Sequence, residues 1–287
     1  MDLWQTLFMG LLQGATELFP ISSLGHSVII PPILHWSYRP SDPTFVPFLV
    51  LLHLGTAGAL LLLYWRDWVG IVKGFVRASI RGRIETPVER LAMLLLVGTI
   101  PAGVIGLVLQ ERLKALFGTP RAAAAFLIVN GLLLLGAEVL RRRSERRDGL
   151  DEQTREQQEG HFKDVGALSF RAAGLIGLCQ ALALLPGISR SGATMGGGLL
   201  AGLSHREAAR FSFLLATPII AAAGLLEVPQ LNVRGAALLQ FLAAAVVAGL
   251  AAYASARFLL RYFTSGRLDP YGVYCVLLGS LALFLLR

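Results

Sequence analysis

The chain has 287 residues, of which 55% are hydrophobic and 15% charged, and its formal net charge is +8. Soluble domains carry about a quarter charged residues, so this composition excludes a soluble globular protein and predicts an integral membrane protein. The basic residues lie mainly between the apolar runs, which argues against a nucleic-acid partner and indicates membrane topology instead.

The first segment of the chain is apolar but does not have the length of two membrane crossings. As helices, Leu7–Phe19 and Ser22–Leu34 would each reach only about 20 Å, against the ~30 Å of a bilayer core. Pro20 breaks the segment, because proline removes a donor and disfavours helix at the preceding residue. Ser22 then stands at an N-cap position. The pattern predicts a re-entrant hairpin of two half-helices.

Six apolar runs of about spanning length follow, at 48–65, 91–109, 121–140, 211–226, 236–260 and 270–286. A second hairpin is expected at 171–203, where Pro186 and Gly187 make the break. The predicted fold is therefore an all-α polytopic membrane protein with about six transmembrane helices and two re-entrant hairpins. It forms a single domain with repeat 1 at 1–140 and repeat 2 at 165–287, joined by a charged cytoplasmic linker at 141–164.

The distribution of basic residues predicts the orientation. The segments 66–90 and 141–171 hold six and eight Lys/Arg and are expected in the cytoplasm, while 35–47, 110–120 and 227–235 face outward. Three spans between the two hairpins make the repeats inverted. In that arrangement broken helices from both halves meet near the midplane, with their N-termini aimed at one site.

A motif is written once in each hairpin. The first copy runs from Gly10 to His26 and the second from Gly177 to Thr194, and they match without a gap at Gly10/Gly177, Leu11/Leu178, Gln13/Gln180, Leu18/Leu185, Ile21/Ile188, Ser22/Ser189 and Gly25/Gly192. The copies differ in chemistry. One brings an acid, hydroxyls and an imidazole, and the other brings a guanidinium between serines.

The first copy offers groups that can converge on one point. Gln13 and Glu17 share a helical face, Ser22 and Ser23 follow the break, and His26 lies one turn beyond Ser22. The alternative for His26 is a core histidine bonded to a carbonyl oxygen. For Ser22 the alternative is a helix cap and nothing more.

The second copy places Arg190 among Ser189, Ser191 and Thr194. A charged side chain at bilayer depth costs about 2.5–3.5 kcal/mol, so Glu17 and Arg190 are expected either to pair with each other across the halves or to face a polar cavity. Helix N-termini attract anions. A phosphate-bearing ligand is the natural expectation, with Ser189 serving also as a cap.

The two motifs resemble a known family. The stretches Gln13–Glu17, Pro20–His26 and Pro186–Thr194 are similar to the signature elements of the undecaprenyl-diphosphate phosphatase family, also called bacitracin-resistance proteins. The similarity extends over nearly the whole chain. Leu24, where many members have threonine, and His53, where glutamine is expected in some relatives, depart from the family pattern.

The resemblance implies a multi-pass enzyme of the bacterial inner (plasma) membrane that hydrolyses undecaprenyl diphosphate to undecaprenyl phosphate, recycling the lipid carrier for cell-wall synthesis and conferring bacitracin resistance. It implies a divalent cation, Mg²⁺ or Ca²⁺, and a site that faces the periplasm or outer side. Carried over, the residues are Glu17, Ser23, His26 and Arg190 for catalysis, Ser22, Ser189, Arg190, Ser191 and Thr194 for the diphosphate, and Glu17 with Gln13 for the metal.

Chemistry agrees with this assignment but leaves the nucleophile open. Arg190 can fork two phosphate oxygens, and a hard cation would prefer Glu17, phosphate and water. His26 or Ser23 could attack phosphorus, or Glu17 and His26 could activate water. The expected partners are the polyprenyl diphosphate and membrane lipid, with no nucleic acid, and a homo-oligomer is left open. The rival hypotheses are a flippase or secondary transporter using the same site, and a purely structural membrane protein.

Overall fold

The computed structural model describes residues 2–36, 42–117, 119–147, 164–231, 233–264 and 266–287, without the side chains of 110–117, 145–147 and 230. These residues form helices and contain no strand. The α-helices are α1 (Leu3–Glu17), α2 (Ser23–Ile33), α3 (Phe45–Leu63), α4 (Trp65–Arg81), α5 (Pro87–Phe117), α6 (Pro120–Arg147), α8 (Phe170–Leu182), α9 (Arg190–Leu200), α10 (His205–Glu227), α11 (Ala236–Tyr262) and α12 (Asp269–Leu285).

Five of these helices are long and apolar enough to cross a membrane, namely α3, α5, α6, α10 and α11. They fall on five of the six predicted spans. The sixth prediction corresponds to α12, an apolar helix of 17 residues, or about 25 Å of helix. The structure confirms an all-helical, multi-pass membrane protein.

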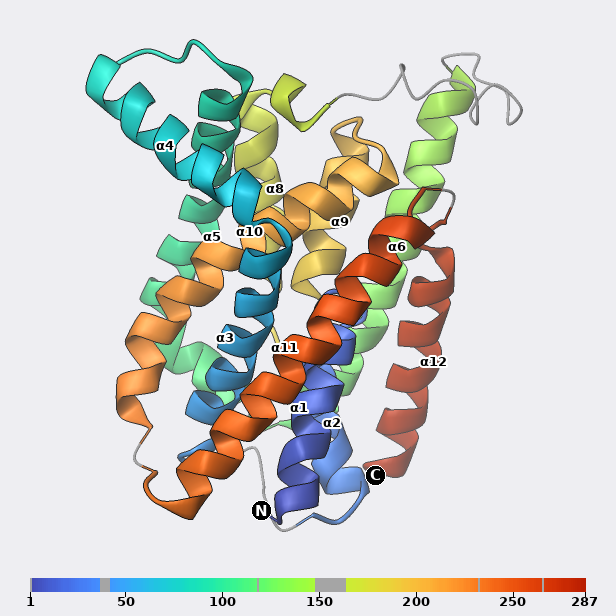
Figure 1. Ribbon diagram of the computed structural model, residues 1–287. Helices are drawn as coiled ribbons and strands as arrows, with labels where there is room; N and C mark the ends of the chain where they lie inside the picture. The colour runs from blue at the N-terminus through green and yellow to red at the C-terminus, as the bar shows by residue number, and fades with distance from the viewer. Residues whose placement is uncertain (1, 37–41, 118, 148–163, 232, 265) are drawn as a thin grey trace.

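Both predicted hairpins are present, and they enter the bundle from opposite ends (Figure 1). α1 rises from the end of the molecule that carries both termini and α2 returns to it, while α8 and α9 do the same from the other end. Their turns meet inside the bundle. The broken helices thus carry four helix ends to the interior, where the backbone groups at those ends need partners.

The predicted caps satisfy part of that need. The Ser22 hydroxyl accepts a hydrogen bond from the Gly25 N–H at 3.1 Å, and the Ser189 hydroxyl accepts one from the Gly192 N–H at 3.1 Å. Ser22 takes a left-handed conformation with φ of 66°, which is uncommon outside glycine. The same capping bond therefore forms in both hairpins at positions that the two sequence copies place in register.

The two hairpins dock on opposite halves of the chain through matching glycines. A Cβ on Gly10 of α1 would overlap the carbonyl oxygen of Ala244 in α11, and a Cβ on Gly177 of α8 would overlap that of Gly98 in α5. Small residues let helices approach closely in membranes. The reciprocal pairing of α1 with α11 and of α8 with α5 is what inverted repeats produce. The division at 1–140 and 165–287 stays a prediction.

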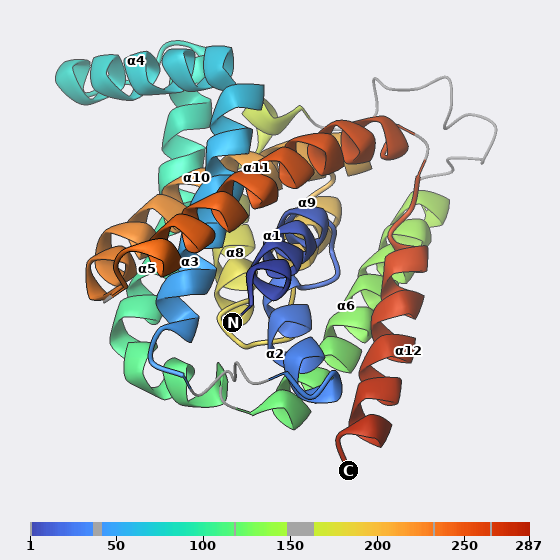
Figure 2. The ribbon, with the colours of Figure 1, turned by 60° about the horizontal axis from the view of Figure 1, so that its bottom comes forward.

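Two segments expected as loops are helical. The basic segment 66–90 contains α4, which leaves the end of α3 and projects beyond the bundle (Figures 1 and 2). α6 continues past residue 140 to Arg147, so the linker expected from 141 begins later. Positions 148–163 of that linker lie outside the described residues.

The arginines in the extension of α6 form ion pairs with buried and neighbouring carboxylates. Glu138 is fully buried and receives hydrogen bonds from Arg141 at 2.7 Å and from His205 of α10 at 2.9 Å. Arg142 also reaches Glu138 and forms an ion pair with Asp269 of α12. These contacts tie α6, α10 and α12 together at the end of the bundle where the basic segments gather.

The glycine docking gives a test with a matched control on one helix. Gly177→Ala should lower the stability of the protein by about 1–3 kcal/mol, because the added methyl meets a backbone carbonyl that cannot move cheaply. Gly174→Ala has its nearest neighbour, a Val97 methyl, at 3.8 Å, and should be neutral or stabilising by up to about 1 kcal/mol. Thermal unfolding in detergent measures both. Equal melting temperatures would contradict the docking.

Candidate active site

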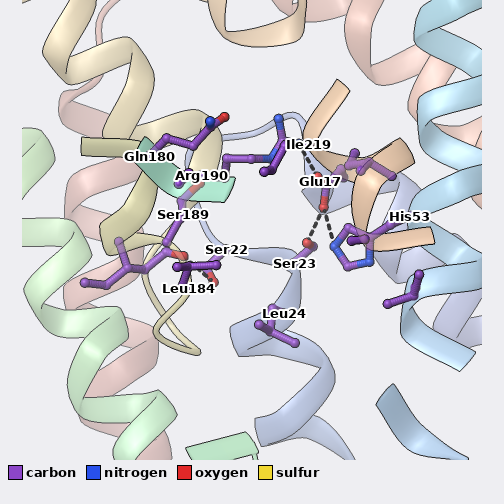
Figure 3. A pocket seen from close by; sticks show the side chains of 16 residues that line it. Glu17, Ser22, Ser23, Leu24, His53, Gln180, Leu184, Ser189, Arg190 and Ile219 are labelled. Atoms are coloured by element: carbon purple, nitrogen blue, oxygen red, sulfur yellow. Dashed lines mark hydrogen bonds and ion pairs between the residues drawn. The ribbon is translucent and has the colours of Figure 1, made fainter. Parts of the chain in front are cut away.

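The centre of the site is the carboxylate of Glu17, the last residue of α1, which is buried where the hairpin turns meet. Its Oε2 accepts hydrogen bonds from Ser23 Oγ at 2.6 Å and from Gln13 Nε2 at 2.8 Å, and lies 3.2 Å from His53 Nε2. Its Oε1 pairs with the guanidinium of Arg190 (Figure 3). Four side chains from α1, α2, α3 and α9 therefore converge on one carboxylate.

Three of the side chains that meet at the site belong to residues at the ends of helices. Glu17 closes α1, Ser23 opens α2 and Arg190 opens α9, so residues from both sequence copies stand at the tips of their hairpins. Gln13 and Glu17 lie four residues apart on one face of α1, as predicted. The ion pair between Glu17 and Arg190 joins the two hairpins.

The site also borders a cavity of about 230 Å³. Its polar lining residues are Glu17, Ser22, Ser23, His53, Gln180, Ser189 and Arg190. Its aliphatic lining residues are Leu24, Val50, Ala102, Ala183, Leu184, Ile188, Ile219, Ile220 and Ala223. Glu17 and Arg190 thus pair with each other and face a cavity at once, so both alternatives drawn from the sequence hold. A cavity lined by both polar and aliphatic side chains suits an amphiphile.

The histidine that lines the cavity is His53 of α3, a departure from the family pattern for which the sequence left two readings open, a second polar group at the site or a packed side chain. Its Nδ1 lies 2.7 Å from the Leu49 carbonyl oxygen and its Nε2 faces the Glu17 carboxylate. Both partners are acceptors, so the ring can donate to both only as an imidazolium. A protonated His53 would place a second positive charge, besides that of Arg190, next to one carboxylate.

His26 lies elsewhere. Its Nδ1 is 2.7 Å from the Ser22 carbonyl oxygen, and its Nε2 is 2.8 Å from the hydroxyl of Tyr274 in α12, against which the ring stacks. It is buried and does not line the cavity. The expected convergence of His26 with Glu17 is therefore not seen, because the first turn of α2 directs Ser23 toward the carboxylate and His26 toward α12.

The residues around Arg190 divide in the same way. Ser189 and Ser22 line the cavity, whereas Ser191 and Thr194 are directed into packing contacts. Ser191 donates to the Phe19 carbonyl oxygen at 2.9 Å, and Thr194 donates to Ser212 of α10 at 2.7 Å. These two hydroxyls fix the start of α9 against its neighbours. Their expected contact with a diphosphate stays a prediction.

Sequence reasoning missed Asn130, a buried residue of α6 that lies between the two hairpin turns. Its amide nitrogen donates to the Pro20 carbonyl oxygen at 3.0 Å, and its amide oxygen accepts from the Ser189 N–H at 2.9 Å. One side chain thereby holds both breaks in register. The available signal was a lone carboxamide in the middle of the apolar run 122–137.

The donor set around Glu17 limits the kind of metal that the site can hold. In the described part of the chain no three His, Cys, Asp or Glu residues group as ligands. Gln13 Oε1 is buried and has no hydrogen-bond partner among the described residues. Gln13 turns its Nε2 toward Glu17, so the amide must flip before its oxygen and the carboxylate can face one hard cation, which would take its remaining ligands from phosphate and water. The two side chains do not form a complete cage.

The fold and the site define a class: a polytopic membrane protein whose cavity, lined by polar and aliphatic side chains around an arginine–carboxylate pair, is built where two hairpins meet. The chain belongs to the family described as bacitracin resistance protein BacA, whose profile it matches over residues 6–281. The family expected from the two motifs is thereby confirmed.

Curated relatives match over their full length. The chain is 47% identical to undecaprenyl-diphosphatase 2 of Chromobacterium violaceum, covering 99% of this chain and 98% of that protein. It is 45% identical to undecaprenyl-diphosphatase of Acidiphilium cryptum, covering 98% and 96%. It is 45% identical to undecaprenyl-diphosphatase of Mycolicibacterium paratuberculosis, covering 97% and 95%.

The position of Asn130 can be tested. Asn130→Ala should lower stability, because it leaves the Pro20 carbonyl and the Ser189 N–H without partners inside the bundle, at about 1–3 kcal/mol for each group. Thr217→Val serves as the control, since the Thr217 hydroxyl is buried without a hydrogen-bond partner among the described residues. Melting temperatures in detergent should fall for the first variant only. A shared melting temperature would remove Asn130 from this role.

Proposed function

We propose that the protein hydrolyses undecaprenyl diphosphate to undecaprenyl phosphate and inorganic phosphate. The observation that carries the proposal is Ser23 hydrogen-bonded to the Glu17 carboxylate beside Arg190, in a cavity that aliphatic side chains also line. The printed names of the full-length relatives support this substrate and reaction. Recycling of the carrier lipid and resistance to bacitracin follow from that activity and from the family description.

The diphosphate binds against the polar lining residues. Arg190 forks two phosphate oxygens, and a protonated His53 adds a second positive charge next to Glu17. The N-termini of α2 and α9 supply N–H groups and the positive ends of two helix dipoles. The isoprenoid chain leaves along the aliphatic lining residues of α3, α5 and α10.

Ser23 is the nucleophile best placed by this geometry. Ser23 already donates to the Glu17 carboxylate across a contact of 2.6 Å, and this carboxylate accepts the Ser23 proton as Arg190 turns from it to the phosphate. The serine oxygen bonds to the terminal phosphorus, the bond from phosphorus to the bridging oxygen breaks, and undecaprenyl phosphate leaves. Water then attacks the phosphoserine, inorganic phosphate departs and Ser23 recovers its proton through Glu17.

The role of His26 follows from its position outside the cavity that holds Glu17 and Ser23. Its ring holds the Ser22 carbonyl and the Tyr274 hydroxyl, so it supports the turn that presents Ser23. We therefore assign it to positioning. Direct activation of water by Glu17 remains the alternative route, with the same carboxylate as base.

A divalent cation, Mg²⁺ or Ca²⁺, belongs to the proposal. Glu17 would hold it together with the unpartnered oxygen of Gln13. When bound, it supplies positive charge to the phosphate oxygens.

The proposed location is the plasma (inner) membrane of a bacterium, with the site open to the outer side. Basic residues gather at the bundle end where α8 and α9 enter, and the positive-inside rule places that end in the cytoplasm. The α1–α2 hairpin then enters from the outer face.

Lipid translocation is the second candidate, because opposed hairpins that meet inside a bundle are also a transporter architecture. A carrier needs an anion site but has no use for a hydroxyl bonded to a carboxylate within it. That pair, Ser23 with Glu17, favours the hydrolase.

The first test is release of inorganic phosphate from undecaprenyl diphosphate by the purified protein in detergent, with and without EDTA. Wild type should release phosphate, and EDTA should abolish release. Ser23→Ala should reduce the rate by at least about 100-fold, the scale of losing a nucleophile or its base. Ser27→Ala is the matched control, because the Ser27 hydroxyl is buried without a hydrogen-bond partner among the described residues. Tight lipid binding without release would favour the carrier.

Arg190→Lys tests the anion clamp. Lysine keeps the charge but loses the planar fork that binds two oxygens, so kcat/KM should fall by about 10- to 100-fold while the protein remains folded. Steady-state kinetics of phosphate release measures the change. Arg257→Gln, at an exposed arginine of α11, controls for general loss of basic charge. Near-normal turnover in the lysine variant would remove the fork from the proposal.

A further inference from the structure

Helix α4 differs from every spanning helix in having three distinct faces. Ile71, Gly74 and Ala78 are buried on one side, toward α5. Arg66, Lys73, Arg77 and Arg81 form a basic stripe beside it. The third face is apolar and exposed, and consists of Trp65, Val69, Val72, Phe75, Val76 and Ile80, whose exposed fractions run from 39% at Phe75 to 81% at Ile80.

This pattern defines where α4 can lie. It is not among the helices apolar enough to span a membrane, and its apolar face is too large for free exposure to water. A helix with a basic stripe beside an apolar stripe lies in the plane of the bilayer interface. α4 follows directly on α3 and projects sideways from the bundle end (Figures 1 and 2). That position keeps it at the headgroup level.

A groove runs below α4. It has a volume of about 210 Å³ and is lined by Trp68, Ile71, Val72, Phe75, Ala92, Leu95, Leu96, Thr99 and Pro218, from α4, α5 and α10. The lining contains no charged side chain, and the Thr99 hydroxyl donates to the Leu95 carbonyl of its own helix. The groove therefore offers nothing to a diphosphate and suits a hydrocarbon chain.

The basic stripe of α4 is available for an anion. Lys73 and Arg77 are exposed and form no ion pair with the part of the chain that the structure describes, and Arg66 stacks over the Trp65 ring. Arg81, by contrast, is paired with Glu85. By helical periodicity Lys73 and Arg77 lie across α4 from the groove, and the exposed apolar face, whose Val72 and Phe75 also line the groove, connects the two. A positive stripe and an apolar groove joined by an exposed apolar face match one chemistry, a negatively charged headgroup that carries acyl chains.

We propose that α4 and the groove below it form a binding site for an anionic phospholipid. Lys73 and Arg77 hold its headgroup, and one acyl chain lies in the groove between α4, α5 and α10. This site is separate from the cavity around Glu17, whose lining shares no residue with it. The argument does not depend on the reaction proposed above.

The test is native mass spectrometry of the protein in detergent with equal amounts of dioleoyl-phosphatidylglycerol and dioleoyl-phosphatidylcholine. Wild type should retain phosphatidylglycerol preferentially. The double variant Lys73→Gln/Arg77→Gln should lower that preference by on the order of tenfold, the effect of two basic residues near a lipid surface. Arg257→Gln/Arg261→Gln is the matched control, because both residues are exposed near the end of α11, away from α4 (Figure 1).

A second variant tests the groove. Leu96→Trp fills it from a residue that is 44% exposed, so folding should be preserved, and retention of phosphatidylglycerol should fall. An unchanged preference in the lysine–arginine variant, or an equal loss in the control pair, would overturn the headgroup site. Unchanged retention in Leu96→Trp would overturn the acyl site. A dimer that the α4 substitutions disperse would assign this face to a second copy of the chain.

Discussion

The ion pair between Glu17 and Arg190 is the interaction on which the rest of the structure depends. Each charge alone would be costly inside a bilayer, and together they lie at the point where two hairpins from opposite ends meet. The pair leaves neither of its two charges without a partner, and a protonated His53 would add a positive charge beside Glu17. When the substrate binds, the Arg190 guanidinium can exchange the Glu17 carboxylate for a phosphate group. It therefore has an anionic partner before and after binding and is never an unpaired charge in an apolar medium.

Broken helices impose a second constraint, because their free backbone groups lie far from bulk water. Part of these backbone groups are satisfied by a serine cap that occurs in both hairpins, and others by the side chain of Asn130, which bonds to both turns. The same contacts that stabilise the turns also set the distance between Ser23 and Arg190. Stability and the geometry of the site therefore rest on the same hydrogen bonds.

Much of this arrangement was predictable, for identifiable reasons. Prolines and serines at fixed spacing predicted the breaks and caps, and the expense of charge in lipid predicted that Glu17 and Arg190 would be neutralised or face a cavity. The orientation of the first turn of α2 was not predictable, so the sequence assigned His26 to the carboxylate that His53 in fact faces. The role of Asn130 was not predicted because its hydrogen-bond partners, Pro20 and Ser189, lie on two segments that are distant in the sequence. α4 was taken for a loop since its basic residues, counted alone, mark only topology.

The reciprocal glycine contacts have a consequence for the origin of the chain. Gly10 meets a helix of the second half and Gly177 meets a helix of the first, through the same kind of backbone contact. A single half inserted into a membrane in both orientations could make these contacts as an antiparallel dimer. Two identical halves would carry the same side chain at both tips, whereas two unlike halves in one polypeptide allow one tip to be acidic and the other basic. The site is therefore asymmetric although the backbone contacts that support it are matched.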